Sequence, residues 1–258
     1  MSFSYQSLLK DEKIINHTKN ILSNQNSDVM TFYMHSEIGL ENIALYNNSD
    51  ENNFIINSVG HSNEDQIFIR SIFNSLDKLI DLDFEEMSHN NGSILDIYSI
   101  NYSSLFALNA VGQALPQESE LGPWWDIFWK DLDGKNSLKN SDKNTIVHEI
   151  GHTLGLSHPN NDPFNESYKD KTIMSYLEGN NGWNDWFTND DISALQSLWG
   201  REDDNGIINI NGKSNEYTFL KLGEFKYGIE TEIGIEDITS IEKVRFTDKE
   251  ININNDII

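Results

Sequence analysis

The chain has 258 residues, which is enough for one domain of medium size and a small appendage. It carries 42 acidic residues against 18 basic ones, giving a formal charge of −24, and such a surface repels phosphate backbones and anionic lipids. We therefore expect no nucleic-acid partner and no membrane insertion. The absence of Cys excludes disulfides and thiolate metal sites.

Common targeting segments are also missing from the sequence. Residues 1–6 have no basic start followed by an apolar run, so we expect no secretory signal peptide. No stretch approaches the roughly 20 apolar residues of a membrane span. Any export would have to use another route.

The first third of the chain alternates between polar and β-forming segments. Residues 1–27 are rich in Asn and Ser with a weak amphipathic stretch, which fits a short helix, a removable propeptide or a frayed arm. Residues 29–34 are β-forming and predict a strand. Residues 46–53 are rich in Asn, Asp and Glu and indicate a loop.

The next segments predict one helix and two strands. Residues 63–80 have a broad apolar face at helical spacing, and Ser62 or Asn63 is the expected N-cap. Residues 83–87 and 94–100 each predict a strand.

Residues 103–123 contain several Gly and Pro residues and indicate a loop. Residues 124–129 are strongly aromatic and predict a strand, and residues 131–134 form an expected turn. Helices are predicted over 141–156 and 189–199. After Gly200, short alternating runs separated by Gly and Asp predict a small β-rich extension.

A histidine motif lies on the predicted helix 141–156. His148 and His152 are four residues apart, so they lie one turn apart and about 40° apart around the helix axis. Both imidazoles can therefore point at one metal ion. Glu149 lies beside them, close enough to hold a water without binding the metal itself. The apolar residues of the helix predict a buried position, and Asn140 or Ser141 is the expected cap, with Asp142 at the positive end of the helix dipole.

A third imidazole follows the helix. Gly155 allows the chain to leave the helix sharply, and Pro159 prevents helix continuation after His158. Three neutral imidazoles and one water make an open tetrahedral zinc site, which is the catalytic rather than the structural arrangement. The alternative is that these are ordinary surface or core histidines.

At these residues the sequence resembles the metzincin metallopeptidases, which combine an extended zinc motif with a later Met-turn. The second element is present as Thr172-Ile173-Met174-Ser175-Tyr176. The resemblance implies that Met174 forms a hydrophobic floor beneath the zinc histidines.

Within that group the chain is most similar to the serralysin-type peptidases. The shared features are Pro159 after the third His, the run Met174-Ser175-Tyr176, and residues 191–200. In that family the Tyr two residues after the Met ligates zinc in the resting enzyme and stabilises the oxyanion when substrate binds, and Tyr176 matches it. The alternative for Tyr176 is a buried, hydrogen-bonding Tyr.

The resemblance implies an α+β fold. A metzincin-type domain has a twisted, mostly parallel sheet with an antiparallel edge strand, two long helices and an active-site helix. The edge strand that aligns the substrate is expected within residues 124–129. We expect an N-terminal arm or propeptide at 1–27, a catalytic domain at 28–200, with the strongest resemblance at 140–200, and a β extension at 201–258.

The C-terminal part departs from the family, because it lacks the Gly/Asp-rich calcium repeats. The run Asp203-Asp204-Asn205-Gly206 offers oxygen ligands for Ca²⁺, with a polar turn as the alternative. The resemblance also implies an extracellular protein exported by a C-terminal signal.

The expected function is a zinc-dependent endopeptidase that acts as a monomer on a protein or peptide substrate, with Glu149 as general base. The main alternative is an inactive, zinc-binding metzincin-like module that acts in binding. A non-peptidase zinc hydrolase is disfavoured by the Met-turn. The matrixin branch is disfavoured by the absence of Cys for a propeptide switch.

Overall fold

The structure is a computed structural model, and it describes residues 3–25, 27–47, 50–131, 137–202, 207–223, 226–231, 234–237 and 243–252. The chain divides into two compact units, Met1–Leu76 with Leu82–Leu195, and Asp77–Asp81 with Gln196–Ile258.

The sequence placed the division after Gly200, five residues later than the observed boundary. The end of helix α4 (Asn189–Trp199) belongs with residues 77–81 because hydrogen bonds join them. Gln196 donates to the Leu79 carbonyl at 2.9 Å, and the Asp81 N–H donates to the Gly200 carbonyl at 3.4 Å.

Unit 1 is an α+β structure built on a seven-stranded sheet. The strand order is β2-β3-β5-β1-β4, with β7 beside β5 and β6 beside β7. The pairs β1–β4, β1–β5 and β5–β7 are parallel, and the pairs β2–β3, β3–β5 and β6–β7 are antiparallel, so the expected mostly parallel sheet is a mixed one. The strands are β1 (Val29–Met34), β2 (Gly39–Asn47), β3 (Asp50–Ser58), β4 (Asp83–Met87), β5 (Leu95–Ser103), β6 (Gly112–Ser119) and β7 (Gly122–Lys130).

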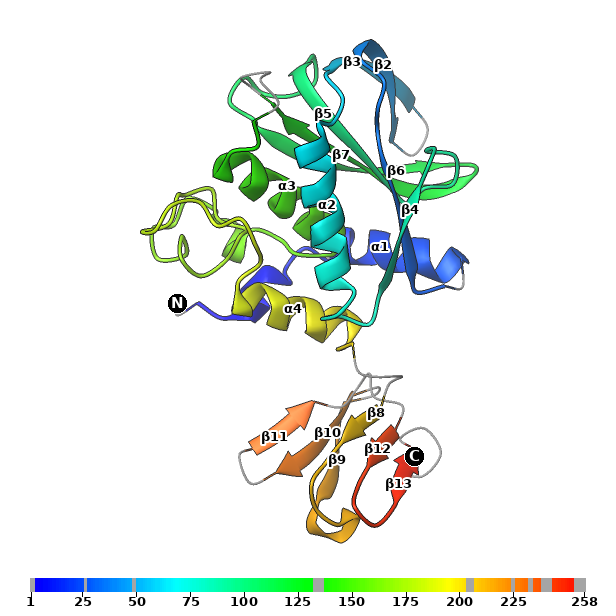
Figure 1. Ribbon diagram of the computed structural model, residues 1–258, viewed down its shortest axis with the longest axis vertical. Coiled ribbons are helices and arrows are strands. Elements are labelled where there is room, and N and C mark those ends of the chain that lie inside the picture. The colour runs from blue at the N-terminus through cyan, green and yellow to red at the C-terminus, as the bar shows by residue number, and fades with distance from the viewer. Residues whose placement is uncertain are drawn as a thin grey trace. The chain divides into compact units, whose positions relative to one another are not determined.

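Helices cover one face of this sheet (Figure 1). The strand register places Phe32, Leu95 and Trp125 side by side on that face. Phe73 stacks on Phe32 with ring centroids 4.1 Å apart, and the Trp125 indole donates to the Thr18 hydroxyl at 3.1 Å. These contacts pack α2 (Asn63–Leu76) and α1 (Glu12–Gln25) against the sheet. Helix α3 (Asn140–Thr153) packs against both of these helices and against β7.

The opposite face buries a second apolar cluster. Tyr98 stacks on Phe128 with centroids 4.9 Å apart, and Phe54 and Phe106 pack edge-on against the same ring. The remaining buried members are Ile56, Ile100 and Leu115. Both faces of the central strands are therefore out of water, which keeps the strands rigid where they support the helices.

Two segments that the sequence assigned to loops are strands. Residues 46–47 and 50–53 belong to the β2–β3 hairpin, and Phe54 and Ile56 on β3 are buried. Residues 103–123 contain β6. Pro116 is tolerated there because β6 pairs with β7 alone among the described strands, so one edge needs no N–H donor. The edge strand is accordingly β6, and not the 124–129 segment of β7.

The helices differ from expectation mainly at their ends. Helix α2 ends at Leu76 rather than at residue 80. It is capped by Ser62, whose hydroxyl accepts the Asp65 N–H at 3.1 Å while the Asp65 carboxylate accepts the Ser62 N–H at 2.7 Å. Helix α3 begins at Asn140 with Lys139 as N-cap, not Asn140 or Ser141, and ends at Thr153.

Unit 2 contains two three-stranded sheets around a small core of Ile229, Val244, Phe246 and Ile251. The expected calcium run 203–206 and part of the expected turn at 131–134 lie outside the described residues. None of the described helices combines the length and apolar character that crossing a bilayer requires. The strands are β8 (Ile207–Asn209), β9 (Thr218–Gly223), β10 (Lys226–Thr231), β11 (Gly234–Asp237), β12 (Lys243–Arg245) and β13 (Glu250–Asn252).

Candidate metal centre

Helix α3 is buried along most of its length, and this fixes two imidazoles in the interior. Ile146, Val147 and Ile150 are fully buried, and His148 is 4% exposed. The rings of His148 and His152 lie one turn apart with centroids separated by 4.8 Å. Because most of the helix is packed against its neighbours, the two rings keep their direction.

Backbone carbonyls orient both of these rings. The Nδ1 atom of His148 lies 2.9 Å from the Ile173 carbonyl, and the Nδ1 atom of His152 lies 2.7 Å from the Leu156 carbonyl. A carbonyl only accepts hydrogen bonds, so Nδ1 carries the proton in each ring. In a neutral imidazole the other nitrogen, Nε2, then presents a lone pair, which is the form that binds metals.

The chain turns after α3 and brings in the third imidazole. Gly155 has a φ of 97°, which disfavours residues with a side chain, and the Leu156 N–H donates back to the Gly151 carbonyl at 2.9 Å. His158 then joins the pair, and candidate ligand atoms of the three histidines lie within 4.8 Å of one another. These three residues could hold a metal ion.

The spacing of the nitrogens fits a metal of small radius. The Nε2 atoms of His148 and His158 are 3.2 Å apart. Two nitrogens bound tetrahedrally at zinc–nitrogen distances near 2.0–2.1 Å would be about 3.3 Å apart. Three nitrogen donors without a thiolate suit zinc and also copper, iron or nickel, so the donor set alone does not choose the metal.

The surroundings keep the three imidazoles neutral. Burial lowers the pKa of His148 well below its ordinary value, and repulsion from the other two rings lowers it further. Burial, followed by repulsion from His158, lowers the pKa of His152 to about 4, and burial lowers the pKa of His158. At neutral pH the rings are therefore unprotonated ligands that need no proton removed before a cation binds.

Glu149 lies on the same helix, buried against the edge strand. Burial raises the pKa of its carboxyl to about 8, and a hydrogen bond from the Ala114 backbone partly opposes this shift. A Cβ atom on Gly112 would lie 2.5 Å from Glu149 Oε1 and 2.6 Å from Thr145 Cγ2. Gly112 thus leaves the space that this carboxylate occupies.

The segment 172–176 passes beneath α3. Met174 is fully buried, and a Cβ on Gly151 would lie 2.9 Å from its sulfur, so any side chain at this crossing would force Met174 to shift. The fully buried Asp191 anchors the segment, because its carboxylate accepts the Ile173 N–H at 2.9 Å and the Thr172 hydroxyl proton. The same carboxylate accepts the N–H and hydroxyl of Thr188, both at 2.8 Å.

Tyr176 lies against the histidines at the end of this segment. Its ring centroid is 4.7 Å from that of His158 and 5.4 Å from that of His148. Burial, followed by the charge of Glu149, raises the pKa of its hydroxyl. Its side chain is 44% exposed, so it borders solvent and is not the buried Tyr of the alternative interpretation.

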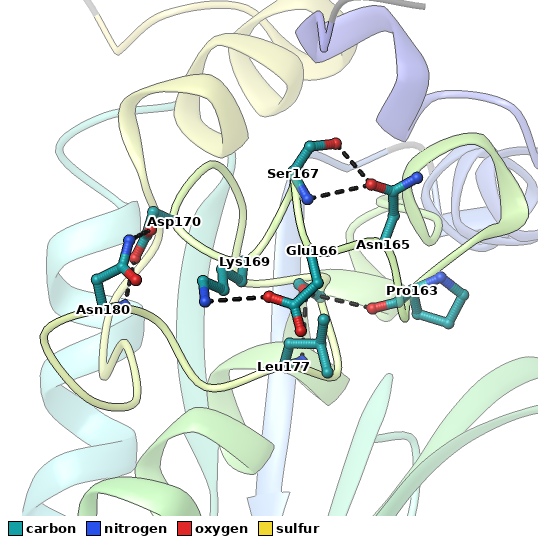
Figure 2. A network of polar contacts seen from close by, with 9 residues as sticks. Pro163, Asn165, Glu166, Ser167, Lys169, Asp170, Leu177 and Asn180 are labelled. Carbon is teal, nitrogen blue, oxygen red and sulfur yellow. Dashed lines mark hydrogen bonds and ion pairs between the residues drawn. The ribbon is translucent and has the colours of Figure 1, made fainter.

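A network of polar contacts holds the loop that carries Tyr176 (Figure 2). The Pro163 carbonyl accepts the Tyr176 N–H at 2.9 Å and the Ser175 hydroxyl proton at 3.2 Å. Further along, the Asp170 carboxylate accepts the Asn180 N–H at 2.7 Å. Hydrogen bonds therefore hold the loop at several points, and this fixes Tyr176 beside the imidazoles.

A cavity of about 470 Å³ opens beside the histidines. Glu149 and His148 line its inner end, and Phe164, Tyr176 and Trp183 contribute aromatic surface. This volume is within the range of sites that hold a small molecule or a few side chains.

No protein-family model matches the chain, and no curated protein matches it either. The assignment of this centre therefore stands on the geometry described above.

Several residues of the centre were missed by the sequence reasoning. The sequence analysis named Asp191 only within the segment 191–200 that resembles the serralysin-type peptidases. An acidic residue in the first turn of a helix can nevertheless accept hydrogen bonds from nearby N–H groups. Gly112 and Gly151 carry no sequence signal of their own, because their importance depends on what lies across from them. Outside the motif, His17, His35 and His61 each contact an oxygen elsewhere, and His89 is exposed.

Proposed function

We propose that the chain is a zinc-dependent endopeptidase with a metzincin-type catalytic domain. The single observation that carries the proposal is the convergence of His148, His152 and His158 next to the buried carboxyl of Glu149. Zinc held there supplies Lewis acidity, which polarises a carbonyl group and lowers the pKa of water toward about 7. The choice of zinc is supported by the serralysin-type resemblance, and the nitrogen-only donor set is compatible with it.

The protein groups divide the work of peptide hydrolysis. Burial alone favours the protonated form of Glu149, but a dication held at the histidines would favour the carboxylate. In that form Glu149 takes a proton from the attacking water and later gives that proton to the leaving nitrogen of the substrate. The Tyr176 hydroxyl donates a hydrogen bond to the substrate oxygen as negative charge develops on it. The Met174 turn supports the histidines from below.

The edge strand offers a way to align the substrate. Strand β6 has one unpaired edge among the described strands, and its Ala114 N–H reaches the Glu149 carboxyl. An extended peptide that added to this edge would run past the histidines with a side chain over the neighbouring cavity. This arrangement favours a polypeptide substrate over a compact small molecule.

The test is Glu149→Gln in the full chain, with metal content and cleavage of an unfolded protein measured together. We expect the variant to retain zinc and to lose about 10²–10⁴-fold in kcat, because the amide cannot accept the proton. Glu64→Gln, at an exposed position on α2, should leave both unchanged. Full activity in the Glu149 variant would end the proposal, and zinc binding by an inactive wild-type protein would favour the binding module instead.

A second variant tests the tyrosine. Tyr176→Phe should keep zinc and lower kcat by roughly 10²-fold with little change in KM, since the hydroxyl acts mainly on developing charge. An unchanged kcat would assign Tyr176 to packing against His158 alone.

A further inference from the structure

His158 is held differently from the other two histidines. The rings of His148 and His152 each donate from Nδ1 to a carbonyl, whereas among the described residues His158 has no such partner for its Nδ1 atom. His158 also lies outside α3, so no helix sets its direction. Its position must therefore come from the backbone on either side of it.

On its N-terminal side, this backbone is tied to the start of the chain. The Ser157 N–H donates to the Leu8 carbonyl at 2.7 Å, and the Ser157 hydroxyl donates to the same carbonyl at 2.9 Å. The Lys10 N–H in turn donates to the Ser157 hydroxyl oxygen at 3.2 Å. Ser157 and Leu8 are both buried, so water does not compete for these bonds.

The C-terminal side of His158 is tied to the same segment. Asn160 and Asn161 have φ values of 51° and 59°, the left-handed conformation that Asn adopts more readily than most residues with a side chain. The Asn160 amide donates to the Tyr168 hydroxyl at 3.0 Å, and the Tyr168 ring packs against Phe3 with centroids 5.5 Å apart. Both flanks of His158 therefore lead to residues 3–10.

We infer that residues 3–10 are an integral part of the metal centre and that Ser157 is a positioning residue that sets His158 for the metal. The inference rests on the metal site of the proposed function. It implies that the N-terminal segment is not a removable propeptide, because its removal would free the backbone on both sides of one ligand.

The test is the zinc affinity of the metal-free full chain, measured by competition with a chelator. Ser157→Ala should weaken zinc binding by about tenfold or more, within the range seen when groups that orient a ligand are removed. Cobalt substitution gives a second readout, because a displaced His158 would change the intensity of the tetrahedral absorption bands. Removal of residues 1–11 should weaken affinity at least as much.

Two variants control for general loss of stability. Ser99→Ala removes a buried hydroxyl on β5 that has no hydrogen-bond partner among the described residues, and it should leave zinc affinity within about twofold. Thr18→Val removes the bond from Thr18 to the Thr153 carbonyl at 2.6 Å, which joins α1 to the end of α3. It should lower Tm without changing zinc affinity, because helix hydrogen bonds still hold His152.

The outcomes separate this inference from the proposed function. Wild-type zinc affinity in Ser157→Ala would overturn the inference, and so would an equal loss of affinity in Thr18→Val. If the wild-type chain binds zinc and Ser157→Ala weakens it, but no peptide is cleaved, the proposed function fails and the inference stands.

Discussion

Helix α3 and the loop that follows it each supply parts of one candidate metal centre, but they are held by contacts of very different range. His148 and His152 owe their relative placement to hydrogen bonds between residues four apart. His158 and Tyr176 depend on Leu8, Pro163 and Asp191, which are distant in sequence or lie on other elements. The placement of His148 and His152 should therefore tolerate many substitutions on the protein surface. The placement of His158 and Tyr176 should be lost when one of these distant contacts is removed.

The largest expected effect comes from removing one imidazole from either half. His148→Ala on the helix and His158→Ala on the loop should each weaken zinc binding on the order of 10³-fold, because two nitrogens cannot replace three. Equilibrium dialysis with metal analysis measures this loss. His89→Ala, at an exposed position, is the control. An equal loss of zinc binding in this variant would show that zinc binds to histidines of the chain without a specific site.

On the helix side, Gly112→Ala should lower kcat by about 10²-fold while zinc is retained. The new Cβ would lie 2.5 Å from Glu149 Oε1, so the carboxylate must move, and small displacements of a catalytic group are costly. Gly122→Ala is the matched control at the other end of the β6–β7 hairpin. Its φ is 122° with no atom within 4 Å of the added Cβ, so it should reduce Tm and leave kcat unchanged.

On the loop side, Asp191→Asn should reduce the free energy of unfolding by about 2–3 kcal/mol. The buried carboxylate accepts four hydrogen bonds from Thr172, Ile173 and Thr188, and an amide cannot accept all of them. Urea denaturation measures the change. Asp190→Asn, on the neighbouring residue, should alter stability by less than about 0.5 kcal/mol; similar values for both would remove Asp191 as the anchor of the Met174 segment.

The last effect concerns two carboxyls that belong to neither half. Burial raises the pKa of Asp96 to about 8, with further contributions from Asp126, while Ser93 opposes the shift. Burial raises the pKa of Asp126 to about 6, opposed by hydrogen bonds from Gln117 and Trp124. The two residues are neighbours in the β5–β7 register.

The sign of the resulting pH dependence follows from the unfolded chain, in which both groups titrate near 3.8. Because the folded-state pKa values are higher, each carboxyl contributes its full stabilisation below pH 3.8. The stabilisation is lost as the pH rises to about 6 for Asp126 and to about 8 for Asp96. Between pH 6 and 8 the free energy of unfolding should fall less steeply in Asp96→Asn than in the wild type, by up to about 1.4 kcal/mol per pH unit. Tm measured against pH for both proteins checks this, and parallel curves would refute it.

Local patterns in the sequence were sufficient to place α2, α3 and α4, but they left α1 open among a helix, a propeptide and an arm. The expected helix 189–199 coincides with α4, and the expected strand 29–34 coincides with β1. The histidine motif needed only the periodicity of a helix and a glycine exit, and both are local properties. Helix α3 ends at Thr153, three residues short of the expected end, because the chain already turns toward Gly155.

The sheet and the loop half of the site could not be predicted in the same way. Strand β6 contains Gly112 and Pro116, and its pairing becomes apparent only when β7 lies beside it. The β2–β3 hairpin is rich in Asn and is held by cross-strand pairing and by burial of Phe54 and Ile56. Ser157 has no signal in the sequence, since its partner Leu8 lies 149 residues away in the chain.

The separation of Ser157 and Leu8 in the chain, 149 residues, affects the order in which the site forms. Closing a loop of that length costs conformational entropy that is offset only once the intervening sheet and helices have assembled. A single turn of helix, by contrast, brings two imidazoles together within about a microsecond. On the inference above, the folding chain first offers a metal ion a weak site of two nitrogens. Tight binding then requires the docking of residues 3–10, so zinc affinity would report that the tertiary structure is complete.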